Sequence, residues 1–240
     1  MASRVVATRA HLGLAKDGDA DRFGLVDADG SFLEPNYFLG LLLSHLVKAR
    51  GWTGGMARSV VNSHLVDAVA RHANIPVFET PAGFKYIGEL IAQGKVVLGG
   101  NESAGLSVKG HVPEKDGILA CLLAADMVAT HGCGRLMDLL RALYAEAGTI
   151  VTKRLNFHLP PGVGERLQAK LEDPPKRLAD RAVIQVNRLN GGENDPGRWQ
   201  LAPPLNLRYR ADGPPLCRGL HGAADGCHRC RGPTAHRPWN

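Results

Sequence analysis

The chain has 240 residues, of which 44% are hydrophobic, and this content is enough to form the core of a globular protein. It contains no run of about 18 uncharged apolar residues and no apolar signal-like stretch after Met1, so we expect a cytoplasmic protein without a membrane partner. Its formal charge is +6, but the last 50 residues hold seven Arg and no Lys, so much of the excess belongs to that segment and we expect no nucleic-acid partner.

Short β-type runs alternate with amphipathic helical stretches from Leu12 to about Val186, which predicts an α/β fold with a largely parallel sheet. Two strands are predicted first, at Leu12–Ala15 and Phe23–Val26, with an acidic loop between them. Pro35 is favourable at the start of a helix, so a helix is predicted from Asn36 to Lys48.

The same alternation continues in the next region. The predicted strands are Ser59–Val61, Pro76–Phe78 and Val96–Leu98, and the predicted helices are His64–Ala73, Phe84–Ala92, Asp116–Thr130 and Arg135–Ala147. The polar segments of this region follow predicted strands, which is where open α/β sheets place their ligands.

The pattern changes near Ile150 and indicates an incomplete α+β unit, with strands at Thr152–Leu159 and Ala182–Val186 and a helix at Gly164–Leu171. Residues 191–240 contain eight Gly, seven Pro and no Ile, Val, Phe, Met or Lys. Such a segment buries too little apolar surface to offset its ordering entropy, so we expect a disordered tail.

Three carboxylates alternate in the first acidic loop, at Asp17, Asp19 and Asp21. Like charges this close destabilise one another unless a cation lies among them, and carboxylate oxygens are the ligands that Mg²⁺ prefers. An EF-hand is excluded because its sixth and twelfth loop positions would be Arg22 and Ala28 instead of Gly and Glu. A phosphatase that uses Asp17 as its nucleophile remains an alternative.

Two later segments offer groups for binding a ligand. The glycines of Gly99–Gly105 could bring backbone amides close to it, while Asn101, Glu102 and Ser103 offer hydrogen bonds to hydroxyl groups. Lys85 lies near the start of a predicted helix, where a cation and a helix N-terminus together favour a phosphate.

A third segment gathers acid and base groups ahead of the next predicted helix, namely His111, Lys115 and Asp116. Asp116 is also a favourable helix N-cap, which is a structural alternative to a chemical role.

Together these segments resemble the α-D-phosphohexomutases of the bacterial phosphoglucomutase/phosphomannomutase type. The matching stretches, in the order of the family, are Leu12–Gly24, Glu79–Gly88, Gly99–Gly105 and Lys109–Gly117. The resemblance implies α/β/α domains with mixed, mostly parallel sheets. It assigns residues 1–52 to the end of domain II, 53–148 to domain III and 149–190 to the start of domain IV.

The resemblance also implies a role for each candidate residue, in a reaction that interconverts hexose 1-phosphate and hexose 6-phosphate through a phosphoserine and a bisphosphate intermediate. Mg²⁺ would be held by Asp17, Asp19 and Asp21. The substrate, a phosphate of glucose or mannose, would be bound by the sugar-binding loop of Asn101, Glu102 and Ser103 and by Arg22, Lys85 and His111. Lys115 and Asp116 are the candidates for proton transfer.

The sequence departs from the family pattern at two points that matter for activity. The family loop reads Gly-Glu-x-Ser-Gly, whereas here Asn101 replaces the first Glu and Ala104 the last Gly. No phosphoserine loop of the type Ser-His-Asn-Pro occurs, so we expect that the phosphoserine domain is missing and that the chain alone is inactive. A non-catalytic sugar-phosphate-binding remnant and a hydrolase using Asp17 are the alternatives, and the oligomeric state is left open.

Residues 191–240 are interpreted as a frameshifted segment, because the family's phosphate-binding Ser-Gly-Thr-Glu-Pro loop is missing from this region. A permitted back-translation of Leu207–Leu220, read one base later, encodes that loop. The alternative is a zinc site at Cys227-His-Arg-Cys230, although the second Cys-x-x-Cys of many such sites is missing.

Overall fold

The computed structural model describes residues 1–132, 134–152, 160, 163, 166, 177–178, 181–182, 186–187 and 200–201. Within this part of the chain, no single helix is long and apolar enough to cross a membrane, and only Gly117–His131 and Leu136–Ala147 taken as a bent pair reach the required length and composition.

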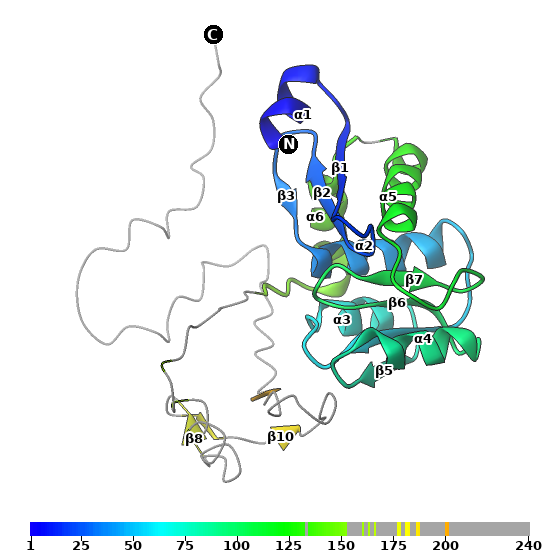
Figure 1. Cartoon of the computed structure of the whole chain (residues 1–240), viewed down its shortest axis with the longest axis vertical. Helices are drawn as coiled ribbons and strands as arrows, with labels where there is room; N and C mark the ends of the chain where they lie inside the picture. Colours follow the sequence, from blue (N-terminus) through cyan, green and yellow to red (C-terminus); the bar gives the residue numbers. More distant parts are fainter. Residues whose placement is uncertain are drawn as a thin grey trace. The chain divides into compact units, whose positions relative to one another are not determined.

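The first sheet contains three antiparallel strands, β1 (Leu12–Lys16), β2 (Phe23–Asp27) and β3 (Phe32–Leu33), in that order. A short helix that the sequence did not predict, α1 (Ala2–Thr8), packs on this sheet (Figure 1). Gly13 permits the close contact, since a Cβ there would lie 2.6 Å from a methyl group of Val5.

The second sheet has the order β5-β4-β6-β7 and is mostly parallel. Its central strands β4 (Gly55–Ser59) and β6 (Val96–Gly100) pair in parallel, as do β4 and β5 (Val77–Thr80), while β7 (Leu106–Val108) is antiparallel to β6. Every residue of β4, β6 and β7 is buried, which is typical of a sheet with helices on both faces. The predicted α/β class with a mixed, mostly parallel sheet is confirmed.

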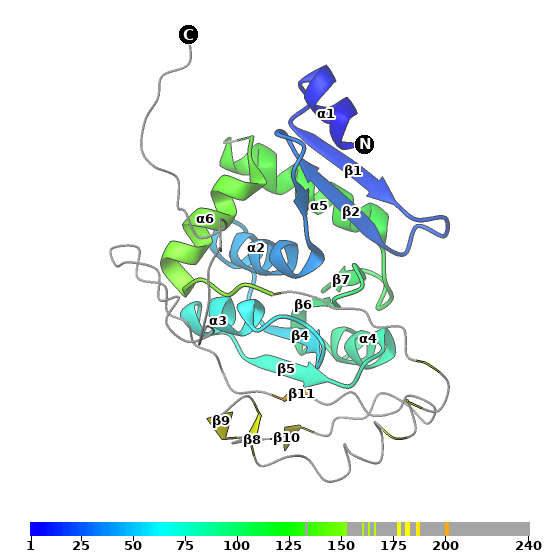
Figure 2. The ribbon, with the colours of Figure 1, turned by 90° about the vertical axis from the view of Figure 1, so that its left-hand side faces the viewer.

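Helices cover the two faces of the second sheet (Figure 2). The face with α4 (Phe84–Ala92) is opposite to the face with α2 (Pro35–Lys48), while α3 (Leu65–His72), α5 (Gly117–His131) and α6 (Leu136–Ala147) all contact α2. The central position of α2 explains why nine of its 14 residues are buried.

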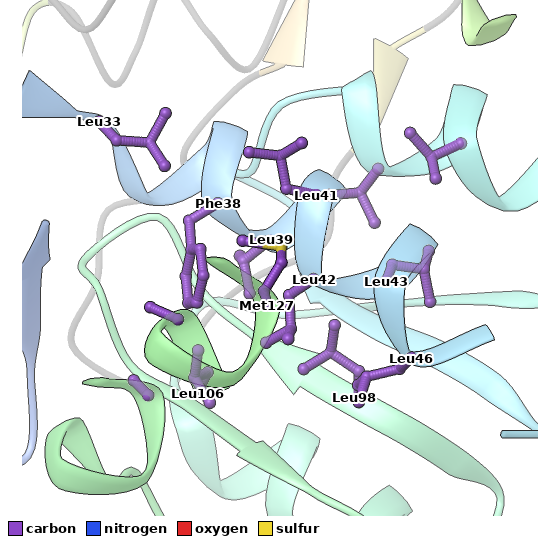
Figure 3. Close-up of a cluster of buried hydrophobic side chains, with 14 of the residues drawn as sticks. Leu33, Phe38, Leu39, Leu41, Leu42, Leu43, Leu46, Leu98, Leu106 and Met127 are labelled. Carbon is purple, nitrogen blue, oxygen red and sulfur yellow. The ribbon is translucent and has the colours of Figure 1, made fainter. Parts of the chain in front are cut away.

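The main core is formed around α2. Leu39, Leu42 and Leu43 are fully buried, and Leu98 and Leu106 of the second sheet belong to the same cluster (Figure 3). Each fully buried side chain of this size contributes about 1.5 to 3 kcal/mol of transfer free energy.

The same helix reaches the first sheet through an aromatic contact. The ring of Phe38 meets that of Phe23 edge to face, with the ring centroids 5.1 Å apart. The core therefore joins the first sheet to the second.

The helices from residue 36 to residue 147 lie within one or two residues of their predicted bounds. The strand predicted at Ser59–Val61 is wrong, because the observed strand β4 ends at Ser59. The backbone amide and the hydroxyl of Ser59 lie within hydrogen-bond distance of the side-chain oxygen of Asn62 instead. The strand predicted at Pro76–Phe78 is shifted to Val77–Thr80, and the one predicted at Val96–Leu98 extends to Gly100. β3 and β7 were not predicted, since two or three residues are too short to show an alternating pattern.

Several predictions lie wholly or largely outside the described residues. These are the strands at Thr152–Leu159 and Ala182–Val186, the helix at Gly164–Leu171, the disordered tail at 191–240 and the zinc alternative within it.

Candidate functional site

Three loops that are far apart in the sequence meet at one place. We call them the acidic loop (17–22, between β1 and β2), the Asn101 loop (101–105, between β6 and β7) and the His111 loop (111–116, before α5). The Phe23 amide, directly after the acidic loop, donates to the Ala104 carbonyl at 3.3 Å, and the Gly117 amide donates to the Ala20 carbonyl at 2.9 Å. An ion pair between Lys115 and Asp21 links the His111 loop to the acidic loop.

Gly117 allows the start of α5 to touch the acidic loop. A Cβ at this position would lie 2.3 Å from the carbonyl oxygen of Arg22 and 2.9 Å from that of Ala20. Because real Cβ atoms do not approach backbone oxygens this closely, any side chain here would push α5 away from the loop.

The three acidic side chains face one another across the acidic loop. One ligand oxygen from each of Asp17, Asp19 and Asp21 lies within 4.8 Å of the other two, with Asp17 and Asp19 exposed and Asp21 half-buried. Three convergent carboxylates with open positions around them fit a hard cation such as Mg²⁺, which keeps several waters or phosphate oxygens as further ligands.

Desolvation acts to raise the pKa of Asp17. The hydrogen bond from the Arg22 amide, at 3.1 Å, and further hydrogen bonds together outweigh desolvation, so the pKa of Asp17 lies below its ordinary value. The carboxylate of Asp17 therefore stays ionised and ready to bind a cation at neutral pH.

Two cations compensate the negative charge of the acidic loop. The Arg22 Nε lies 3.8 Å from a carboxylate oxygen of Asp17 and 3.5 Å from one of Asp21. Lys115 reaches Asp21 by passing over Gly105, where a Cβ would come within 2.6 Å of the Lys115 side chain. The side chains of Arg22 and Lys115 therefore lie where they could contact an anionic ligand bound to a metal ion at the three carboxylates.

The Asn101 loop is closed by its own first side chain. The Asn101 Oδ1 accepts from the Gly105 amide at 2.9 Å, and the Asn101 amide donates to the Gly105 carbonyl at 2.9 Å. Ala104 adopts φ 67°, a left-handed conformation that favours glycine. Since its oxygen is engaged in the loop, Asn101 has mainly its side-chain NH₂ group to offer a ligand.

Glu102 is held on both sides by hydroxyl groups. Its Oε1 lies 2.8 Å from the Ser103 hydroxyl, and its Oε2 lies 3.0 Å from the hydroxyl of Ser59, at the end of β4. No pattern in the sequence pointed to Ser59, because its partner Glu102 lies 43 residues away in the chain.

The glycines before the Asn101 loop have a packing role that the sequence did not predict. Gly99 and Gly100 are the last two residues of β6 and are buried. A Cβ at Gly99 would lie 2.3 Å from Ile87 of α4, and one at Gly100 would lie 2.3 Å from Leu39 of α2. The two glycines therefore let helices pack closely on both faces of the strand that carries the loop.

The His111 loop pairs an imidazole with a carboxylate. His111 Nε2 lies 2.8 Å from Asp116 Oδ2, while Asp116 Oδ1 accepts from the amides of Ile118 and Leu119, each at 2.9 Å. Asp116 is thus the N-cap of α5. The Leu119 amide, followed by further hydrogen bonds and opposed by desolvation, holds the pKa of Asp116 below its ordinary value, so this carboxylate is ionised at neutral pH.

Lys85 lies on the second residue of α4, with its ammonium 4.8 Å from the ring centroid of Tyr86. One turn later α4 packs on the His111 loop at Gly88, where a Cβ would lie 2.3 Å from the Pro113 carbonyl oxygen. In the described part of the chain, Lys85 forms no ion pair with the other candidate residues.

A hollow of about 650 Å³ lies elsewhere, beside β5 and α3, and none of the candidate residues lines it. Its charged lining residues are Arg58, Asp67, Glu79 and Arg71. The guanidinium of Arg58 is paired with Asp67 and Glu79.

Comparisons with known proteins agree with this architecture. The model of the family "Phosphoglucomutase/phosphomannomutase, alpha/beta/alpha domain III" matches residues 34–147. The phosphoglucomutase of Rhizobium radiobacter is 36% identical over 139 residues, which are 57% of this chain and 25% of that protein. The cytoplasmic phosphoglucomutase of Pisum sativum is 36% identical over 219 residues, or 82% of this chain and 37% of that protein.

Solved structures give the same result. A putative phosphomannomutase from Thermus thermophilus has a TM-score of 0.56 at 33% identity and covers 61% of this chain and 33% of that chain. A family protein from Burkholderia thailandensis, at 22% identity, shares the fold with a TM-score of 0.57 over 79% of this chain and 38% of that chain. The chain thus spans between about a quarter and two fifths of these relatives, and it belongs to the α-D-phosphohexomutase family.

Proposed function

We propose that the three loops bind a hexose phosphate together with Mg²⁺, as part of the interconversion of hexose 1-phosphate and hexose 6-phosphate. The observation that carries this proposal is the direct contact of the acidic loop with the Asn101 and His111 loops. It is supported by the relatives, which are named phosphoglucomutases.

Asp17, Asp19 and Asp21 would hold the metal, because their oxygens converge and each is a hard ligand. When bound, Mg²⁺ supplies positive charge that stabilises a phosphoryl group during transfer. Arg22 lies beside the same carboxylates and would contribute a second, fixed positive charge for the phosphate.

The Asn101 loop would bind the sugar hydroxyls. The Glu102 carboxylate and the Ser103 hydroxyl are joined at 2.8 Å and would act as a pair, while the Asn101 amide group would donate a hydrogen bond. Lys85 and His111 would contact the phosphate. Their positions on α4 and on the loop against which α4 packs allow them to act together.

Lys115 and Asp116 would move the proton of the reacting hydroxyl. The lowered pKa of Asp116 leaves its carboxylate ionised, which favours a role as the orienting partner of His111 and disfavours one as an acid. Lys115, which pairs with Asp21, would then give a proton to the leaving oxygen.

The complete reaction also needs a phosphoserine that donates its phosphoryl group to one hydroxyl and regains the other phosphate from the bisphosphate. No Ser-His-Asn-Pro-like sequence occurs among the 240 residues. We therefore expect binding without turnover by this chain alone.

The test is an incubation of the purified chain with Mg²⁺, glucose 1-phosphate and a catalytic amount of glucose 1,6-bisphosphate, combined with titration calorimetry. Mg²⁺-dependent binding without product is the expected result, and glucose 6-phosphate would show a complete mutase. Free phosphate that disappears with Asp17→Asn would instead show a hydrolase.

Asp19→Asn should weaken the Mg²⁺-dependent binding at least tenfold, since it removes one of three charged metal ligands. Asp29→Asn is the matched control, because Asp29 is an acidic turn residue outside the cluster. Absence of any Mg²⁺-dependent sugar-phosphate binding would refute the proposed function.

A further inference from the structure

A chain of buried hydrogen bonds runs from the Asn101 loop into the core. Its first member is Ser59, whose hydroxyl lies 3.0 Å from Glu102 Oε2 and 2.8 Å from Asn62 Oδ1. Ser59 is only 1% exposed and Asn62 only 3%, although both are polar. A buried polar pair of this kind costs free energy unless its hydrogen bonds are all made, so its presence calls for a reason.

Asn62 is itself fixed from two sides. Its Oδ1 accepts from the Ser59 amide at 2.9 Å, and its Nδ2 donates to Asn36 Oδ1 at 3.1 Å. Asn36 lies in the first turn of α2 and also accepts from the Ser63 amide at 3.1 Å. In the described residues no buried side-chain nitrogen or oxygen lacks a partner, so the chain of bonds is complete.

The direction of the Ser59 hydroxyl follows from this arrangement. The hydroxyl has one proton to donate and two acceptors within reach. Asn62 Oδ1 is neutral and already accepts from the Ser59 amide, whereas the Glu102 carboxylate is charged and accepts more strongly. The proton therefore goes to Glu102, while Asn62 Oδ1 keeps the hydrogen bond from the Ser59 amide and so fixes the backbone of Ser59.

We propose that Ser59 is a positioning residue that orients the Glu102 carboxylate, and through it the Ser103 hydroxyl, for contact with the sugar. This inference rests on the proposed function, in which the Asn101 loop binds the sugar. Since Ser59 ends β4 and Asn36 lies in the first turn of α2, the orientation of Glu102 is set by the rigid core and not by the loop itself. Pre-orientation of this kind removes an ordering cost from ligand binding.

A double-mutant cycle tests the proposal. Glucose 1-phosphate is titrated with Mg²⁺ present into the wild-type chain, Ser59→Ala, Glu102→Gln and the double variant, and the melting midpoint of each is recorded. Ser59→Ala should weaken binding about tenfold in the wild-type background and no more than about twofold in the Glu102→Gln background, since neighbours that act through one another are not additive. An equal loss in both backgrounds would mean that Ser59 supports only the fold, and would overturn the proposal.

A second measurement needs no ligand. In ¹H–¹⁵N spectra of the chain, Glu102→Gln should shift the signals of Ser59, Ser63 and the Asn62 side chain. Glu89→Gln is the matched control, because Glu89 is an exposed residue of α4. Unchanged signals in Glu102→Gln would refute the link between Ser59 and Glu102.

The two measurements also separate this inference from the proposed function. If the wild-type chain binds no sugar phosphate, the proposed function fails, and the spectra alone then decide whether Ser59 holds Glu102.

Discussion

Asp27 is a single residue that stabilises a contact between distant segments. It is fully buried at the end of β2, and its carboxylate accepts from the amides of Leu136 at 3.0 Å and Met137 at 2.9 Å, at the start of α6. α6 has no cap from its own N-cap residue, so Asp27 takes this role from a position 109 residues earlier in the chain.

Asp27→Asn should therefore lower the free energy of unfolding by about 1 to 3 kcal/mol, because an amide nitrogen would face donor groups in a buried site. Urea denaturation followed by circular dichroism measures this change. Asp138→Asn on the exposed surface of α6 should cost less than about 1 kcal/mol. Equal losses in the two variants would show that Asp27 does not cap the helix.

Ala104 is the second residue with a measurable cost. Its φ of 67° is left-handed, which is unfavourable for a residue with a Cβ. Ala104→Gly should raise the free energy of unfolding by about 0.5 to 1 kcal/mol, since the strain relieved exceeds the entropy that Gly adds to the unfolded chain. Ala125→Gly, at an exposed position of α5, is the control and should lower the free energy of unfolding by about 1 kcal/mol. If both variants are less stable than the wild type, Ala104 is not strained.

At the scale of elements, the contact of α5 with the acidic loop depends on Gly117. Gly117→Ala should lower the free energy of unfolding by about 1 to 3 kcal/mol, because the new methyl group would meet the Arg22 carbonyl oxygen at 2.3 Å. It should also weaken Mg²⁺ binding in calorimetry, as the acidic loop moves. Gly18→Ala in the same loop is the control, since a Cβ there meets nothing within 4 Å and both quantities should stay nearly unchanged.

A buried ion pair joins β4 to α3. Arg58 donates to both carboxylate oxygens of Asp67, at 2.7 and 2.8 Å, and its side chain is only 5% exposed. Desolvation acts to raise the pKa of Asp67, but hydrogen bonds from His64 and Arg58 outweigh it, so the folded-state pKa lies below the ordinary value.

This shift has a defined sign in a pH series. The stabilisation from Asp67 is complete above the unfolded-state pKa of about 4 and is lost as the pH falls through the lower, folded-state pKa. In urea denaturation, Asp67→Asn should be several kcal/mol less stable at pH 7 and should lose less stability than the wild type between about pH 4 and pH 2. An unchanged acid-side slope in the variant would show that Asp67 is not the titrating group.

At the scale of the whole molecule, the gene sequence tests whether residues 191–240 are a frameshifted segment. Our interpretation predicts that the plus-one reading frame across residues 199–220 encodes Ser-Gly-Thr-Glu-Pro, followed by an alternating apolar strand. Sequencing of the gene through this region tests it. A plus-one frame without that loop would refute the frameshift and restore the zinc alternative at Cys217, Cys227 and Cys230.

Several features of the fold and the candidate site were predictable from local signals. The start of α2 follows from Pro35, and the N-cap of α5 from Asp116, because both signals act within one turn of a helix. The convergence of Asp17, Asp19 and Asp21 was also predictable, since their spacing in a short loop leaves them few other arrangements.

Only the tertiary structure decided the rest. The sequence led us to assign Gly99 and Gly100 to ligand approach, whereas the packing of α2 and α4 requires them in β6. The end of β4 at Ser59 and the bond from Ser59 to Glu102 depend on partners brought together by the fold. Local propensity acts over a few residues, but a buried hydrogen bond or a helix contact is selected by the whole core, so its partners cannot be found from spacing alone.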